Sequence, residues 1–238
     1  MAQMAAGSYT MGKKKSKKEN TKQTNKEVEK TNFVVNHKLS DSGVTVYQHK
    51  DDKNHVVVAH RGTAVGGKKG LKDLMNDATL SLGINAGHKK RFNQRKRTTE
   101  KAIRELKPTQ LHITGHSLGG GTANHAVNES KLIRDNLTSL QTFNGAATLK
   151  SQKKLSKSEQ SKLKGKVIHH RIKSDVVSIS SRVKPPLGGK VKTTSMKKKP
   201  VKKKTLGRRI LNLHPAVKVA KVAKASLDSH SIDNFIKK

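Results

Sequence analysis

One serine lies in a pattern that is typical of nucleophilic hydrolases. Gly115-His116-Ser117-Leu118-Gly119 reads G-x-S-x-G and stands between an apolar run, 111–114, and a segment of helical pattern, 118–128. A serine on a sharp strand-to-helix turn exposes its Oγ, and flanking glycines avoid clashes in that turn. The helix directs its free N–H groups at the same spot, so the backbone N–H of Leu118 is a candidate oxyanion donor. The pattern predicts acyl transfer by Ser117; a tight turn with an exposed serine is the alternative interpretation.

A nucleophilic serine needs a histidine base and an acid that orients this base. In hydrolases built on a parallel sheet the chain order is Ser, then Asp or Glu, then His. Asp175 fits the acid because it follows a strand-like run, 167–172, and would lie at the sheet edge that carries Ser117. The histidines after Asp175 are His214 and His230, and both are candidates for the base.

The segments around these residues alternate between strand-like and helical patterns. This alternation predicts an α/β fold with a mainly parallel sheet flanked by helices. The turn-forming residues 51–54 predict that the first two strands form a hairpin. The expected strands are 44–47, 55–60, 111–114, 140–143 and 166–172, and the expected helices are 68–77, 94–106, 118–128 and 215–226.

Basic residues dominate the composition and are concentrated in two segments. Lys and Arg number 52 against 16 Asp and Glu, which gives a formal net charge of +36. Residues 1–30 carry eight Lys against three Glu without apolar periodicity, which predicts a disordered arm. Residues 184–209 carry eleven Lys or Arg and no acid, interrupted by Pro and Gly, which predicts a low-complexity insertion. The folded domain is therefore expected to span 31–238 and to be interrupted at 184–209.

Composition also excludes several classes of protein. The chain has no cysteine, which excludes a disulfide scaffold and thiolate chemistry. No window approaches the ~20 apolar residues of a membrane-spanning helix. The first residues lack the apolar core of a signal peptide, so we expect an intracellular protein. Serine-based acyl transfer requires neither a metal nor another cofactor.

Two motifs resemble those of a known family. Ile113 to Gly121, ITGHSLGGG, resembles the nucleophile elbow of the class-3 lipases, the fungal-type triacylglycerol lipase family of α/β-hydrolases. His55 to Thr63, HVVVAHRGT, resembles the strand of that family that ends in Arg-Gly-Ser/Thr, and it precedes the elbow as it does there. The resemblance covers roughly 40–183 and the end of the chain. It implies an α/β-hydrolase fold, with Thr63 as the second oxyanion donor.

The resemblance also implies a particular catalytic triad. The acid of the family follows a strand and begins an Asp-x-Val sequence, as Asp175 does. Its catalytic histidine lies in a loop a few residues before an aromatic residue, and His230 precedes Phe235 in this way. The resemblance therefore favours His230 over His214. The implied triad is Ser117, His230 and Asp175.

The expected function is hydrolysis of carboxylic esters of lipids. The segment that would form the lid of a lipase, 79–97, is diluted by His88-Lys89-Lys90-Arg91, which favours a phospholipid or soluble ester over triglyceride. The basic segments would attract an anionic membrane surface or bind nucleic acid without sequence preference. A second hypothesis is an idle hydrolase scaffold that serves as a basic structural or nucleic-acid-associated protein, in the nucleus or a virus particle. Peptidase or thioesterase activity of the same triad is a third.

Overall fold

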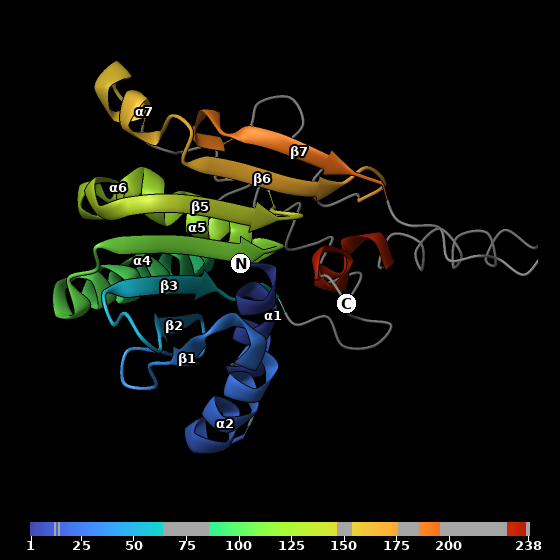
Figure 1. The fold of residues 1–238 in the computed structure, drawn as a ribbon. Coiled ribbons are helices and arrows are strands. Elements are labelled where there is room, and N and C mark those ends of the chain that lie inside the picture. The colour runs from blue at the N-terminus through green and yellow to red at the C-terminus, as the bar shows by residue number, and fades with distance from the viewer. Residues whose placement is uncertain are drawn as a thin grey trace, which may run out of the picture.

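The computed structural model describes residues 1–11, 13, 15–63, 86–146, 154–175, 186–195 and 228–236. These residues contain a seven-stranded sheet whose strands follow one another in chain order (Figure 1). The first three strands are antiparallel, and all strands from the third onward are parallel. The strands are β1 (Phe33–Val35), β2 (Val44–His49), β3 (His55–His60), β4 (Gln110–His116), β5 (Leu137–Phe143), β6 (Val167–Ile172) and β7 (Lys190–Thr194).

Helices connect the parallel strands. α4 (Ala86–Leu106) lies between β3 and β4, and α5 (Leu118–Glu129) and α6 (Lys131–Asn136) lie between β4 and β5. α7 (Lys157–Leu163) precedes β6 and begins at a capping box formed by Ser156 and Glu159. The predicted α/β fold with a mainly parallel sheet is therefore confirmed, including the hairpin of β2 and β3.

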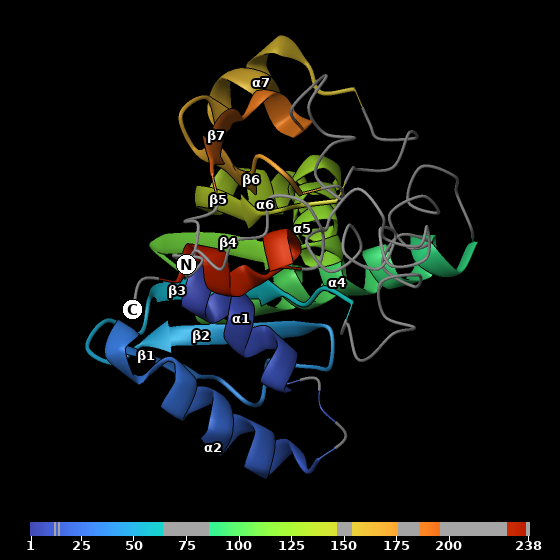
Figure 2. The same cartoon turned by 90° about the vertical axis from the view of Figure 1, so that its right-hand side faces the viewer.

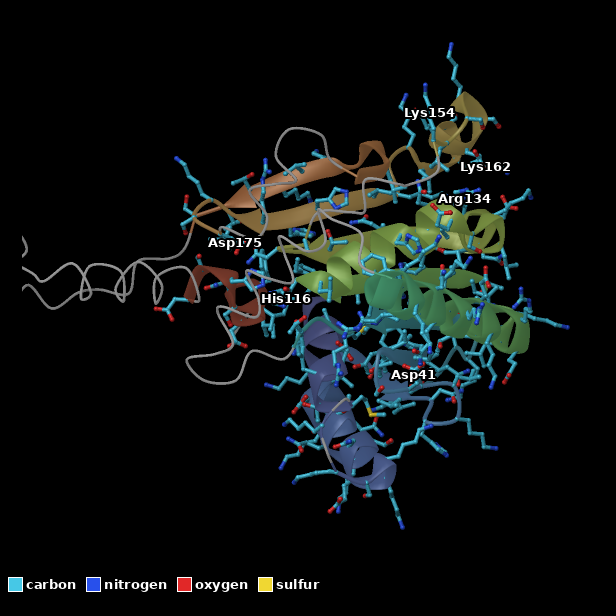
Figure 3. The ribbon with its side chains drawn as sticks, turned by 180° about the vertical axis from the view of Figure 1, so that it is seen from behind. Asp41, His116, Arg134, Lys154, Lys162 and Asp175 are labelled. Carbon is cyan, nitrogen blue, oxygen red and sulfur yellow. The ribbon has the colours of Figure 1, made fainter. Side chains whose placement is uncertain are left out.

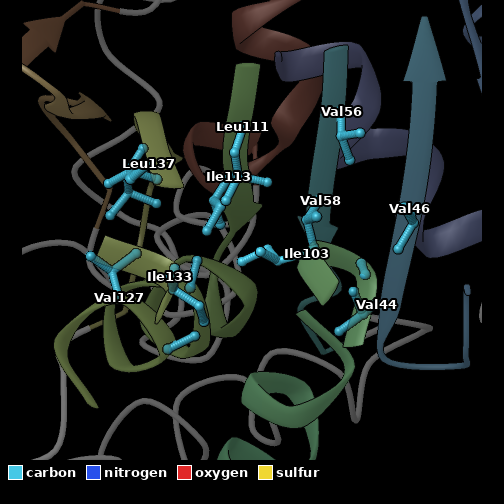
Figure 4. Close-up of a cluster of buried hydrophobic side chains, with 14 of the residues drawn as sticks. Val44, Val46, Val56, Val58, Ile103, Leu111, Ile113, Val127, Ile133 and Leu137 are labelled. Atoms are coloured by element: carbon cyan, nitrogen blue, oxygen red, sulfur yellow. The ribbon is translucent and has the colours of Figure 1, made fainter. Parts of the chain in front are cut away.

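The main core fills one face of the sheet. Val56 and Val58 of β3 point to this face and pack with Ile103 of α4 and Val127 of α5 (Figure 4). The intervening residues of β3, Val57 and Ala59, belong to a second cluster on the other face, because side chains alternate along a strand. β3 is apolar on both faces and therefore requires a cover on each side.

Two helices at the start of the chain provide the second cover, which differs from the expected disordered arm over 1–30. α1 (Ala2–Met11) and α2 (Lys17–Glu27) fold over β1, β2 and β3, with Met4 and Met11 buried in the second cluster. Ser16 caps α2 through a capping box with Glu19. Burial of these methionines against Val57 and Ala59 outweighs the Lys-rich composition, because the lysines project from the exposed side.

Part of the expected low-complexity insertion is also ordered. Residues 186–195 form a short 3-10 turn, η3 (Pro186–Gly188), and the edge strand β7, which pairs in parallel with β6. An edge strand accommodates lysines because its side chains are mostly exposed to water. Residues 196–209, as well as the expected helices 68–77 and 215–226, lie outside the described residues.

Segments from both ends of the chain lie at the carboxyl edge of the sheet. The 3-10 turn η4 (Ile232–Phe235) lies beyond the ends of β4 and β5, where Phe235 packs on Phe143 with ring centroids 5.1 Å apart (Figure 1). The view onto this edge shows α1 beside η4, and the two elements are in contact (Figure 2). Within the described part of the chain, no helix combines the length and apolar character needed to cross a membrane.

Candidate active site

Ser117 occupies a strained turn at the carboxyl end of β4. Its backbone has φ 57° and ψ −129°, a conformation that residues other than glycine rarely adopt. Two close approaches explain the flanking glycines. A Cβ on Gly115 would lie 2.4 Å from the backbone of Gly119, and one on Gly119 would lie 2.2 Å from the carbonyl oxygen of His60. The turn thus has the geometry of a nucleophile elbow and is held by backbone packing.

Asp175 and His230 form a buried pair on the same edge. Asp175 follows β6 and is fully buried, and His230 is 4% exposed. Nδ1 of His230 lies 2.7 Å from Oδ1 of Asp175. A carboxylate accepts a hydrogen bond, so Nδ1 carries the proton and Nε2 of His230 is the basic nitrogen. Figure 3 shows Asp175 and His116 at this end of the sheet, away from Arg134.

Two buried atoms at this edge have no hydrogen-bond partner among the described residues. They are the Oγ of Ser117 and the Nε2 of His230. Buried polar groups are normally satisfied, and those that are not require an explanation such as a catalytic role. Here the two atoms are a potential nucleophile and the basic nitrogen of an oriented imidazole.

His116 holds the segment that carries His230. Its Nε2 lies 2.6 Å from the carbonyl oxygen of His230 and must therefore donate a proton to it. Its Nδ1 then accepts from the hydroxyl of Tyr9 of α1, at 2.8 Å. Burial, followed by the charge of His230, lowers the pKa of His116 to about 3, so its imidazole is neutral at neutral pH. His116 therefore positions the segment of His230 in addition to packing within the elbow.

Asn144 provides a second link to His230. Its Nδ2 donates to the carbonyl oxygens of Ser229 and His230, at 3.0 and 3.3 Å, and its Oδ1 accepts from the N–H of Ile172 at 2.9 Å. Asn144 therefore ties β5 to β6 and to the segment before η4.

The expected oxyanion donors belong to two segments, the start of α5 and the loop after β3. Leu118 is the first residue of α5, and the first N–H groups of a helix have no acceptor within it. Thr63 follows β3 and lines a pocket of about 280 Å³ beside the elbow. His214 lies outside the described residues, as does the first part of the expected lid, 79–85.

The rest of the expected lid, 86–97, forms the first half of α4. Phe92 is fully buried there, against Leu118 and edge-on to His125 at 5.1 Å. The sequence analysis did not identify Tyr9 or the roles of His116 and Asn144. For Tyr9, the available signal was a tyrosine among the apolar residues of 1–11. In the described part of the chain, no three or more His, Asp or Glu are grouped to hold a metal ion.

A solved lipase shares the fold. The crystal structure of M37 lipase matches with a TM-score of 0.53 at 18% identity, over 74% of this chain and 66% of that chain. The lipase from Rhizopus microsporus var. chinensis matches with a TM-score of 0.46 at 17% identity, over 75% of this chain and 67% of that chain. This chain therefore spans just under two thirds of the length of M37 lipase. Among curated proteins, no match was found.

The described residues thus form a lipase-like α/β fold with a mainly parallel sheet, as the motif resemblance implied. The match of a family model is more specific. The chain belongs to the phospholipase-like family described as the Tle-like phospholipase domain, whose model matches residues 1–231. The match begins at residue 1, which agrees with the packing of α1 and α2 on the sheet.

Proposed function

We propose that this chain hydrolyses a carboxylic ester of a phospholipid, with Ser117 as nucleophile, His230 as base and Asp175 as the acid that orients His230. The hydrogen bond of 2.7 Å between the buried Asp175 and His230 carries the proposal. It fixes the tautomer that leaves Nε2 basic, and His116 and Asn144 hold His230 beside the elbow of Ser117.

In the proposed reaction, Oγ of Ser117 attacks the ester carbonyl while Nε2 of His230 takes its proton. Asp175 stabilises the imidazolium through the Nδ1 hydrogen bond. The N–H groups of Leu118 and Thr63 stabilise the oxyanion. The imidazolium then protonates the leaving alcohol, and an acyl-enzyme forms. Water, deprotonated by His230, releases the fatty acid and restores Ser117.

Two observations support a phospholipid as the substrate. The family model is that of a phospholipase-like domain. The formal net charge of +36 would also attract the chain to an anionic leaflet, where each cation near the surface contributes up to ~1 kcal/mol. Binding to the membrane surface would then also bring the chain to its phospholipid substrate.

Labelling with a fluorophosphonate tests the proposal without knowledge of the substrate. The serine oxygen attacks phosphorus and displaces fluoride, so the probe reports an activated serine. We expect labelling of the wild type and its loss in Ser117→Ala and His230→Ala. Ser139→Ala and the exposed His37→Ala serve as matched controls and should label normally. Absence of labelling in the folded wild type, with and without detergent, would refute the proposal.

The alternative hypothesis, an idle scaffold suggested by the high positive charge, predicts the opposite result of the labelling experiment. Such a protein would not label and would co-purify with nucleic acid that is released by salt, because phosphate binding by lysines weakens steeply with ionic strength. Labelling together with ester turnover would exclude it.

A further inference from the structure

A pocket beside the elbow is unusually rich in arginine. It has a volume of about 280 Å³ and is formed by the loop before β2, the loop after β3 and the first half of α4. Three guanidinium groups and one carboxylate contribute to its wall. The lining residues are Asp41, Ser42, Gly43, Arg61, Gly62, Thr63, Arg91, Gln94 and Arg95.

Arg95 is fixed in the wall of this pocket. Only 5% of the residue is exposed, and its Nη1 donates to the carbonyl oxygen of Arg61 and, at 3.0 Å, to Oγ1 of Thr122. Its Nε is buried and has no hydrogen-bond partner among the described residues. Arg91 lies one helical turn earlier on the same face of α4 and is exposed. One guanidinium is thus held in place while its neighbour is accessible.

The carboxylate of Asp41 does not form an ion pair with these arginines in the described part of the chain. Its Oδ1 accepts from the backbone N–H groups of Gly43 and Val44, at 2.7 and 2.8 Å, and its Oδ2 accepts from Thr98 at 2.8 Å. Asp41 therefore shapes the loop before β2. Among the described residues that line the pocket, three guanidinium groups stand against one carboxylate.

The charges of these arginines repel one another. Burial, followed by the positive charges of Arg91 and Arg61, lowers the pKa of Arg95 to about 10, so Arg95 stays protonated at neutral pH. Burial likewise lowers the pKa of Arg61. Like charges held together in a partly buried site are stabilised by a bound anion. The pocket therefore suits an anionic ligand.

One residue of the pocket wall, Gly62, packs against the backbone of the elbow. Thr63, the expected oxyanion donor, is part of the same wall. Gly62 lies so close to the residue before Ser117 that an added Cβ would be 2.6 Å from the carbonyl oxygen of His116. An anion in the pocket would therefore be held beside the reacting carbonyl. In a glycerophospholipid the phosphodiester and the ester carbonyl are separated by only a few bonds.

We infer that this arginine pocket binds the phosphodiester group of the lipid substrate while the ester carbonyl lies at Thr63. Guanidinium groups match phosphate oxygens in a planar, two-pronged geometry, which a single ammonium group does not provide. The inference rests on the proposed esterase function and adds to it the feature that would distinguish a phospholipid from an uncharged ester.

Arg91→Gln tests the inference because the exposed Arg91 contributes little to packing. We expect kcat/KM for a phosphatidylcholine to fall by about tenfold to a hundredfold, and kcat/KM for p-nitrophenyl butyrate to stay unchanged. Arg97→Gln is the matched control, because it removes the same charge from an exposed position of α4 outside the pocket. Equal losses on both esters, or equal losses in both variants, would overturn the inference and leave the esterase proposal intact.

A binding experiment separates the pocket from catalysis. Ser117→Ala protein is titrated in a calorimeter with a short-chain diether phosphatidylcholine below its micelle concentration, and separately with inorganic phosphate. The inference predicts binding of the diether lipid that Arg91→Gln weakens at least tenfold and Arg97→Gln does not. Binding of inorganic phosphate alone, or lipid binding that is insensitive to Arg91, would overturn it. If the wild type neither labels nor turns over any ester, the esterase proposal fails, and this titration still decides the pocket.

Discussion

Removal of the hydroxyl of Tyr9 tests whether α1 is part of the active site. The chain has two tyrosines, the half-buried Tyr9 and the buried Tyr47, and both hydroxyls form hydrogen bonds. Tyr9 donates to Nδ1 of His116 at 2.8 Å, whereas Tyr47 donates to the carbonyl oxygen of Met4 at 3.1 Å. Burial raises the pKa of both above the usual range, so both keep the proton that they donate. Tyr9→Phe and Tyr47→Phe are therefore a matched pair.

The two changes should cost similar stability and differ in activity. Each leaves a buried acceptor without its donor, which costs about 1–3 kcal/mol of unfolding free energy. In Tyr9→Phe the unpaired acceptor is the imidazole of His116, which positions His230 through its other nitrogen. If ~1.4 kcal/mol of this loss appears in the transition state, kcat falls about tenfold. KM should not change, because Tyr9 does not line the arginine pocket.

The assay combines urea unfolding with steady-state kinetics and the rate of fluorophosphonate labelling. Both variants should show lower urea midpoints, and only Tyr9→Phe should show lower kcat and slower labelling. The reasoning is refuted if Tyr9→Phe retains full kcat while folded. It is equally refuted if Tyr47→Phe loses as much activity, because the effect would then be one of stability alone.

Three further predictions follow from the geometry of the site. Asp175→Asn should lower kcat by about 10³–10⁴-fold, because an amide does not stabilise the imidazolium of His230; active-site titration and kinetics measure this. Gly119→Ala should lower the unfolding free energy by about 1–3 kcal/mol or more, measured in urea, because its Cβ would lie 2.2 Å from the carbonyl oxygen of His60. Burial lowers the pKa values of His60 and His116 to about 3, so the unfolded state binds protons first below pH ~6.5. The stabilising contribution of the neutral histidines should be fully present above that pH. Below it, the unfolding free energy should fall toward pH 3 by roughly 1.4 kcal/mol per pH unit for each histidine. Urea midpoints at pH 7 and pH 5 measure this loss.

Each of these predictions has a control. Asp135→Asn removes an exposed carboxylate that pairs with lysines and should leave kcat unchanged. Gly145→Ala meets no atom closer than 3.3 Å and should be milder than Gly119→Ala. His60→Gln should flatten the dependence of stability on pH. A midpoint of the wild type that is constant from pH 7 to 5 would contradict the assignment of neutral, buried histidines.

Local patterns were sufficient to predict the strands from β2 to β6 and the turn at Ser117, but not the edge strands β1 and β7. The hairpin of β2 and β3 follows from two β-branched runs around a turn, and the alternation of strands and helices defines the parallel part. Asp175 was predicted from its position after a strand, because parallel strands end at a common edge. The structure pairs it with His230.

Contacts between distant segments could not be predicted in this way. The hydrogen bond of Asn144 to Ser229 joins residues 85 positions apart, and no local sequence pattern predicts it. The fold of α1 and α2 depends on the second face of β3, whose apolar Val57 and Ala59 need a cover. The Lys-rich composition of residues 1–30 predicted a disordered arm, because the methionines that are buried in the structure are few.

The imidazole of His116 joins three parts of the chain. Its two nitrogens bond to residues 107 positions before it and 114 positions after it. Such a junction depends on the docking of two outlying segments, whereas the central strands have their own core. Release of either segment would abolish the proposed activity while the sheet stays intact. Retained activity would therefore be a stricter test of an intact preparation than its circular dichroism spectrum.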